Sequence, residues 1–286
     1  MKGRIHRECD VIIFMAKFEK KMTRKDELEG YANKYKIKLQ KKVPVFVVID
    51  GRSFKTFTKG FERPMDSVFN KAMQETMRFL CDAAQGCVFG YTSSDEITLV
   101  LTDYCRWNSA ACFDYDLTNL CSAAASIATD AFARYFIEAV EDFEENSKSE
   151  DKDRLIEAYE RAIDIGATFT ANCFNVPEDR VVEMIYWKQL DHRRHAIQSL
   201  GRQYYTRAEL LGKCNDEVIE MVGEKGVSWE DMPTVMKHGT CCHKGVNPLA
   251  QKKSWVVDND MPMLDADHCS YLQDIISTVR IEEDED

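Results

Sequence analysis

The chain has 286 residues, enough for one large domain or two small ones with a sizeable core. Its 44% hydrophobic and 30% charged composition is that of an ordinary globular protein, and the apolar run Val11–Ala16 is too short for a signal-peptide core or a membrane span. The formal net charge of −11 argues against binding of nucleic acid through overall basic charge, although a local basic patch would suffice.

Eleven cysteines are scattered along the chain without a Cys-x-x-Cys pair, and several, such as Cys81, Cys87 and Cys121, stand in apolar or helical runs. This pattern indicates reduced thiols and a cytoplasmic protein. The sequence Cys241-Cys242-His243 could bind a metal, but no second pair of ligands accompanies it, so we interpret it as ordinary structure.

Residues 1–21 have no clear structural pattern, and we interpret them as an extension whose start is not necessarily the native one, with Met22 as the alternative start. Thr23 is a candidate N-cap of a helix with acidic residues in its first turn. Residues 33–42 carry five lysines and are interpreted as a solvated helix end. The β-branched run 43–49 predicts a strand that ends at Asp50-Gly51.

The following elements alternate between helix and strand patterns. A helix is predicted from Asp66, as its N-cap, to Cys81. Strands at 87–91 and 97–101 predict a β-hairpin with a turn at 92–95. An Ala/Ser-rich helix is predicted at 113–140, a strand at 167–176, and helices from 181 to 221. Two segments are strongly acidic: 141–160, interpreted as a solvated helix end or loop insertion, and the tail 258–286, expected to be frayed.

The order strand, helix, strand, strand, helix, strand predicts an α+β fold, the ferredoxin-like βαββαβ palm with added helices. Residues 22–140 would form the core of the palm, and 161–257 would complete the palm and add a helical region. Chemistry has to be argued from the carboxylates, because the fold alone does not define it.

Three carboxylates stand at strand ends. Asp50 ends the first strand, and Asp95-Glu96 lie at the hairpin between the second and third. In this fold the first and third strands are neighbours, so the acids should meet. Carboxylates together with substrate phosphates bind Mg²⁺, and two such ions can stabilise the attacking and leaving oxygens of an in-line displacement. Gly51 would allow close approach and offer its carbonyl.

Residues 44–103 resemble the catalytic core of the tRNA-His guanylyltransferase family, the 3′–5′ polymerases, in its guanylyltransferase-like branch. The resemblance rests on Asp50-Gly51-Arg52-Ser53-Phe54-Lys55, on Arg63-Pro64-Met65-Asp66 and on Gly90-Tyr91-Thr92-Ser93-Ser94-Asp95-Glu96. Residues 187–191 are similar to the family's Trp-Arg-Gln-x-Asp motif. Residues 209–213, 226–229 and 237–240 are similar to downstream blocks of the guanylyltransferase-like branch. The similarity extends over about 22–245.

The chain departs from the family pattern at several places. Phe169-Thr170-Ala171-Asn172 stands where the family has Phe-Asp-Gly/Ala-Arg, and Arg194-His195 where it has Arg-Asn. Asn119 replaces a Lys ahead of the matching Ser122, and Ser93 replaces a Gln. The carboxylates are intact while charge is lost from the residues expected to bind the nucleotide and the RNA, which puts activity on a standard tRNA in doubt.

The resemblance implies template-type 3′–5′ addition of nucleotides to the 5′ end of tRNA or a similar RNA, as in tRNA-His maturation or 5′-end repair, with ATP and GTP as substrates. It assigns Asp50, Asp95 and Glu96 as catalytic, and Asp50, the Gly51 carbonyl and Asp95 as ligands of two Mg²⁺ ions. The implied nucleotide-binding residues are Asp50, Gly51, Arg52, Ser53, Phe54, Lys55, Arg63, Asp66, Ser94, Asp95 and Ser122.

For RNA, the best local patch consists of Lys188, Arg193, Arg194, Arg202 and Arg207, with Lys237 nearby in a downstream block and Tyr204 and Tyr205 as stacking surface. A solvated helix face is the alternative interpretation of this patch. His192 and His195 are interpreted as phosphate contacts or surface residues, because no third metal ligand accompanies them. Relatives form dimers and tetramers, so a homo-oligomer is expected, without a membrane partner.

Two other functions compete with this interpretation. A palm-type nucleotide cyclase would use the same acids, but its hairpin would have a Gly-Gly-Asp/Glu-Glu-Phe signature. A degenerate RNA- or nucleotide-binding module would explain the lost charges, but it gains little from retained acids beside a phosphate backbone. Metal-dependent nucleotide binding distinguishes the module from an enzyme.

Overall fold

The computed structural model describes residues 23–105, 109–246 and 253–282, and the chain divides into two units, Met1–Ile37 and Lys38–Asp286. The predicted extension 1–21 and the end of the acidic tail, 283–286, lie outside the described residues. In the first unit, helix α2 (Arg24–Asn33) begins after Thr23, as predicted. The Thr23 side chain accepts from Asp26 N, and the Asp26 carboxylate accepts from Thr23 N, which forms a capping box.

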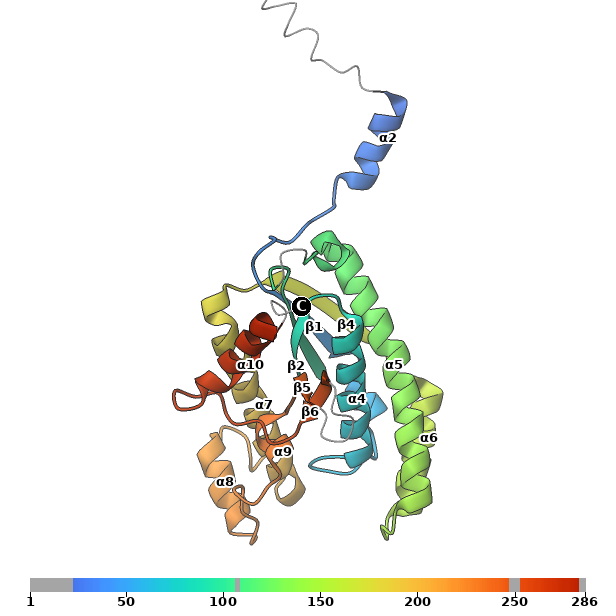
Figure 1. Cartoon of the computed structure of the whole chain (residues 1–286). Coiled ribbons are helices and arrows are strands. Elements are labelled where there is room, and N and C mark those ends of the chain that lie inside the picture. Colours follow the sequence, from blue (N-terminus) through green and yellow to red (C-terminus); the bar gives the residue numbers. More distant parts are fainter. Residues whose placement is uncertain (1–22, 106–108, 247–252, 283–286) are drawn as a thin grey trace, which may run out of the picture. The chain divides into compact units, whose positions relative to one another are not determined.

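The described strands of the second unit form one six-stranded antiparallel sheet in the order β4-β1-β3-β2-β5-β6 (Figure 1). The first four are β1 (Val45–Gly51), β2 (Cys87–Ser93), β3 (Glu96–Leu101) and β4 (Phe169–Asn175). Their order and connections are those predicted, and β1 pairs directly with β3. Strands β5 (Thr240–Val246) and β6 (Lys253–Asp258) extend the sheet beyond β2 and were not predicted.

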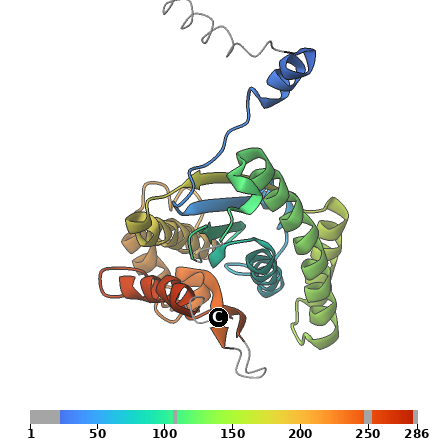
Figure 2. The ribbon, with the colours of Figure 1, turned by 45° about the horizontal axis from the view of Figure 1, so that its top comes forward.

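One face of the sheet is covered by α4 (Ser67–Ala83) and α5 (Leu117–Asn146) (Figure 2). The carboxylate of Asp66 caps α4 by accepting from Phe69 N at 2.9 Å, as its predicted N-cap role requires. Helix α5 begins after the 3₁₀ helix η1 (Cys112–Tyr115) and runs six residues beyond its predicted end at 140.

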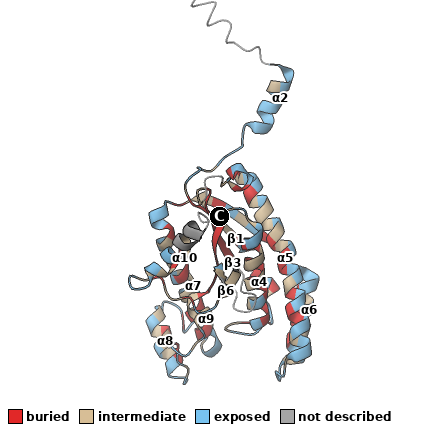
Figure 3. Cartoon of the chain, viewed as in Figure 1, coloured by how far each residue is buried: buried red, intermediate tan, exposed pale blue. Residues whose placement is uncertain are grey.

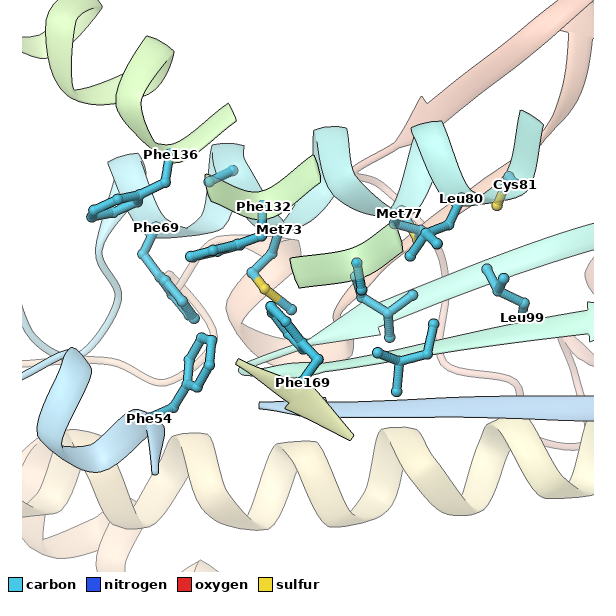
Figure 4. Packing of buried hydrophobic residues seen from close by; sticks show 14 of the residues in the cluster. Phe54, Phe69, Met73, Met77, Leu80, Cys81, Leu99, Phe132, Phe136 and Phe169 are labelled. Atoms are coloured by element: carbon cyan, nitrogen blue, oxygen red, sulfur yellow. The ribbon is translucent and has the colours of Figure 1, made fainter. Parts of the chain in front are cut away.

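Aromatic rings fill the space between this sheet face and its helices. The short helix α3 (Phe54–Phe57) inserts the ring of Phe54, whose centroid lies 5.1 Å from that of Phe169 and 5.7 Å from that of Phe132 (Figure 4). Such edge and tilted contacts add to the free energy gained by burial. Because α3 directly follows Asp50-Gly51, this core fixes the chain at the end of β1.

The acidic segment 141–160 is only partly solvated. Its second part belongs to α6 (Lys152–Ile165), where Leu155, Ala158, Tyr159 and Ala162 are buried while the other faces are exposed (Figure 3). Their spacing is that of one helix face, which the intervening acids obscure in the sequence. The interpretation as a solvated helix end or loop insertion is therefore wrong for residues 152–160, whereas residues 141–146 do form the end of helix α5.

The other sheet face carries η2 (Glu178–Arg180), α7 (Val181–Tyr204) and α10 (Cys269–Glu282). Phe46, Ile185, Met261 and Leu272 belong to the buried cluster on this face. The prediction of a frayed tail is thus wrong for its described part, because Met261 and Leu272 have no exposed surface.

Helices α8 (Asn215–Gly223) and α9 (Thr234–His238) pack beside α7 around Trp229. Across this contact the Nε2 of His192 lies 3.3 Å from the Val235 carbonyl. Burial lowers the pKa of His192, and hydrogen bonds to the backbone of Val235 and Met236 oppose the shift. The ring thus serves the α7–α9 contact and is not the surface or phosphate contact that the sequence suggested.

We expect His192 to make the protein less stable at acidic pH. As the pH falls through the ordinary histidine pKa of about 6.5, the unfolded chain takes up a proton that the folded chain does not, so the free energy of unfolding decreases. Urea denaturation at about pH 7.5 and about pH 5 measures this loss, and His192→Gln should reduce it. An equal loss in the variant would assign the effect to other groups.

Candidate active site

A row of four polar residues crosses the sheet at the hairpin end. Thr170, Asp50, Glu96 and Ser93 are successive partners on β4, β1, β3 and β2. Side chains directly opposite one another on neighbouring strands share a face. The same face carries Phe46 and is covered by α7. Val45, Val47 and Ile49 alternate with these residues along β1 and point to the opposite face, into the core beneath α4 and α5.

Asp95 is held against this row by the backbone. The turn between β2 and β3 contains only Ser94 and Asp95, two residues instead of the predicted four, and Ser94 has the left-handed φ of 53°. The amide of Gly51 donates to the Asp95 carbonyl at 3.0 Å, and Ser94 Oγ donates to Asp95 Oδ1 at 3.1 Å. The two carboxylate-bearing segments are therefore joined, as their predicted proximity requires.

The charges at this point influence one another. Partial burial raises the pKa of Asp50, the nearby negative charges of Asp95 and Glu96 raise it further, and Lys188 opposes these effects. Asp50 itself is exposed, whereas Asp95 and Glu96 are half-buried. The three acids thus form a crowded anionic group that is open to solvent at Asp50.

Lys188 of α7 belongs to this group. Its Nζ donates to Glu96 Oε1 at 2.6 Å, and its side chain is only 7% exposed, compared with 31% for Glu96. The hydroxyl of Thr98 also donates to Glu96 Oε1, at 3.4 Å. The structure therefore places Lys188 beside the carboxylates and not on an exposed face with the other basic residues predicted for RNA.

The segment after Asp50 presents its polar groups to solvent. Arg52, Ser53 and Lys55 are exposed, and Ser53 adopts a left-handed φ of 60°. Phe54 contributes only backbone here, since its ring is buried. A Cβ built on Gly51 would lie 2.5 Å from that ring, so only glycine fits this position. Backbone turns with exposed amides and nearby cations can bind phosphate groups.

Three other predicted nucleotide contacts lie outside the carboxylate group. Asp66 is 5% exposed, and its oxygens accept from Glu62 N, Phe69 N and the Tyr159 hydroxyl. Ser122 is on α5, which covers the opposite sheet face, and its hydroxyl donates to the Asn119 carbonyl. Arg63 is exposed and donates to the Thr58 hydroxyl at 3.3 Å.

The remaining basic residues predicted for RNA are partly engaged by neighbours. Arg194 pairs with Asp191 at 2.6 Å, the Arg193 guanidinium lies 5.9 Å from the Trp229 ring centroid, and Lys237 donates to the Glu230 carbonyl. Arg202 and Arg207 are exposed. These residues offer a discontinuous basic surface along α7 and its continuation.

The residues at the site fit a metal only together with a substrate. Among the described residues, no group of three His, Cys, Asp or Glu side chains could hold a metal ion by itself, at Cys241-Cys242-His243 or elsewhere. Asp50 and Asp95 nonetheless provide anionic oxygens whose repulsion a cation would reduce. Two carboxylates completed by phosphate oxygens are the kind of donor set that Mg²⁺ accepts.

Comparison with known families decides the class of this site. The family described as Thg1, tRNAHis guanylyltransferase, matches residues 25–177, more than half of the chain. The chain belongs to the Thg1 family. It is therefore a nucleotidyltransferase, of a family that adds nucleotides in the 3′–5′ direction.

Two solved structures described as a bacterial tRNA(His) guanylyltransferase (Thg1)-like protein share this architecture. The structure in complex with ATP is 27% identical, with a TM-score of 0.74 and coverage of 89% of this chain and 99% of its own. The structure in complex with GTP is 27% identical, with a TM-score of 0.66 and coverage of 88% and 97%.

More distant similarities agree with the assignment. The tRNA(His) guanylyltransferase from Saccharomyces cerevisiae shares the fold, at 18% identity, a TM-score of 0.59 and coverage of 78% and 97%. The uncharacterized protein R259 of Acanthamoeba polyphaga mimivirus is 25% identical over 245 residues, 81% of this chain and 80% of that protein. Within the described residues, no helix has the length and apolar character needed to cross a membrane.

The departures from the family sequence pattern are not scattered in space. Thr170 and Ser93 flank Asp50 and Glu96 in the polar row, and Asn172 pairs with Val48 beside it. His195 is instead exposed on α7 near Asp191, and Asn119 lies in the first turn of α5. Three of the five departures therefore change the surroundings of the carboxylates, which the sequence alone did not reveal.

Proposed function

We propose that this Thg1-family protein adds GTP to the 5′ end of tRNA or a similar RNA in the 3′–5′ direction. The observation that carries the proposal is the meeting of Asp50 with Asp95 and Glu96 across β1 and β3, with the Gly51 amide bonded to the Asp95 carbonyl. Relatives bound to ATP and to GTP support these nucleotides as substrates.

In the proposed reaction, the 5′-monophosphate of the RNA first attacks the α-phosphorus of ATP or GTP and displaces pyrophosphate, so that the RNA end carries AMP or GMP. The 3′-hydroxyl of the incoming GTP then loses its proton and attacks the 5′ phosphorus of the RNA, forming a phosphodiester bond while AMP or GMP leaves. An RNA end that already carries a triphosphate needs no activation. Phosphoryl transfer depends mainly on positioning and on neutralisation of charge. The protein therefore has to align the 3′-hydroxyl of GTP with the 5′ phosphorus of the RNA.

The residues of this chain divide that task. Asp50 and Asp95, with the Gly51 carbonyl, would hold Mg²⁺, which supplies charge neutralisation for the phosphates when bound. Arg52, Ser53 and Lys55 would bind the triphosphate through amides and charge, and Ser94 would contact the nucleotide. Arg202 and Arg207 would contact the RNA backbone.

Incubation with Mg²⁺, ATP, GTP and a tRNA lacking its first nucleotide tests the proposal. We expect extension of the 5′ end by the wild type and none by Asp95→Ala. A triphosphorylated end should be extended with GTP and Mg²⁺ alone, because it needs no activation, whereas omission of ATP should reduce extension of a monophosphorylated end to the level that activation by GTP supports. Absence of extension with GTP and Mg²⁺ still bound would direct the search to another RNA.

The second candidate is an RNA- or nucleotide-binding module without catalysis. The polar but uncharged Thr170, Asn172 and Ser93 around the acids favour it, because the family pattern has Asp, Arg and Gln there. Loss of both extension and Mg²⁺-dependent GTP binding in the wild type would establish this candidate over the enzyme.

A further inference from the structure

We propose that Lys188 is a positioning residue of the carboxylate site, where it neutralises Glu96 and orients it toward α7. The proposal rests on the proposed function only in assigning GTP as the ligand of the site. Lys188 would act through Glu96 and without contacting RNA.

The burial of Lys188 carries the first step. A lysine that is only 7% exposed gives up most of its hydration, and such a charge is stable only when it is paired and hydrogen-bonded. The Glu96 oxygen at 2.6 Å provides this partner. A phosphate of RNA that approached the same ammonium group would compete with this carboxylate.

The neighbouring residue fixes α7 in the register that this pair needs. Gln189 has no exposed surface, and its amide nitrogen donates to the carbonyls of His238 at 3.3 Å and Pro262 at 3.0 Å. Its oxygen accepts from Leu264 N at 2.8 Å. These bonds join α7 to the last residue of α9 and to the segment that leads into α10. They limit sliding and rotation of the helix, so Lys188 stays directed at Glu96.

The charge distribution explains the use of such a pair. Asp50, Asp95 and Glu96 would place three negative charges where a triphosphate has to bind, and like charges disfavour an incoming anion. Pairing with Lys188 leaves Glu96 and Lys188 neutral together. Asp50 and Asp95 then remain as the carboxylates that face the ligand.

A double-mutant cycle tests this inference by Mg²⁺-dependent binding of a fluorescent GTP analogue, without RNA. Lys188→Met should weaken binding about tenfold or more, since it leaves the half-buried Glu96 unpaired and its negative charge beside Asp50 and Asp95. Lys188→Arg should retain most of the affinity. Lys188→Met combined with Glu96→Gln should bind within about threefold of Glu96→Gln alone, because the lysine acts through that carboxylate.

The exposed pair of Lys71 and Asp142, 2.5 Å apart on α4 and α5, provides the matched control. Lys71→Met should leave GTP binding unchanged. If Lys188→Met fails to fold, we expect the double variant to fold again, as monitored by thermal denaturation. Such a recovery supports the coupling between Lys188 and Glu96. If folding fails in the double variant as well, the inference is overturned.

Additive effects of the two substitutions on GTP binding would overturn the inference. So would a Lys188→Met effect confined to the KM for RNA, which would make Lys188 an RNA contact. Absence of RNA extension by the wild type would count against the proposed function and leave this cycle interpretable.

Discussion

Asp50→Asn is expected to lower the rate of nucleotidyl transfer on the order of 10³-fold while the protein remains folded. The substitution removes one of the two carboxylates that face the ligand and keeps the shape of the side chain. Single-turnover addition of labelled GTP to a 5′-truncated tRNA measures the effect. Because Asp50 ends β1 beside the Asp95 turn, nothing else in the group can replace its oxygens at that point.

The free energy of unfolding of the same variant should stay equal or increase, although its activity falls. The raised pKa of Asp50 means that its ionised form is less favourable in the folded protein than in the unfolded chain. A neutral asparagine removes this cost, so urea denaturation at neutral pH should show equal or greater stability. Lost activity with retained stability identifies a site that is optimised for function.

The exposed Asp164 of α6 provides the control for these measurements, since it lies outside the carboxylate group. Asp164→Asn should change neither activity nor stability appreciably. Retention of full transfer activity by Asp50→Asn would refute the assignment of Asp50, whatever its stability.

The central fold and the carboxylate group were predictable because their signals are local. A few neighbouring residues are enough to predict each element: the run 43–49 predicts a strand, the residues around Ser94 predict a hairpin, and Asp66 predicts the start of a helix. The βαββαβ order then makes the first and third strands neighbours, and the observed pairing of Asp50 with Glu96 follows. The family pattern over the same residues agrees with this geometry.

Features that depend on tertiary packing could not be predicted in the same way. Lys188 stands among other basic residues of α7, and only the rotation of that helix about its axis distinguishes a buried partner of Glu96 from exposed Arg194. Likewise, the acids of 152–160 hide the apolar face of α6, and the tail is fixed by Met261 and Leu272 through distant contacts.

The position of the departures also needed the structure. In the sequence, Thr170 and Ser93 are 77 positions apart by their numbers, yet they flank the same two carboxylates. The family pattern has an Asp and an Arg at 170 and 172, so their joint replacement leaves the local net charge unchanged. This explains how the carboxylate group can be retained while its surroundings change.

Asp66→Ala is expected to destabilise the protein by about 3 kcal/mol, because three groups lose their common acceptor. The carboxylate caps α4 through Phe69 N, fixes the preceding loop through Glu62 N, and binds the Tyr159 hydroxyl of α6 at 2.9 Å. Chemical denaturation measures the loss. Tyr159→Phe removes only one of these bonds and should cost about 1 kcal/mol.

Asp66→Asn separates this structural role from the nucleotide contact predicted from the sequence. Asparagine can still cap α4 through its one carbonyl oxygen, but its amide nitrogen cannot accept from Glu62 N, so this variant should lose only part of the stability that Asp66→Ala loses. If Asp66 acts only within the fold, the folded variant binds GTP as the wild type does. A GTP affinity that falls in the folded variant would instead establish the nucleotide contact. The burial of Asp66 favours the first result, since its oxygens already serve α4, the loop before it and α6.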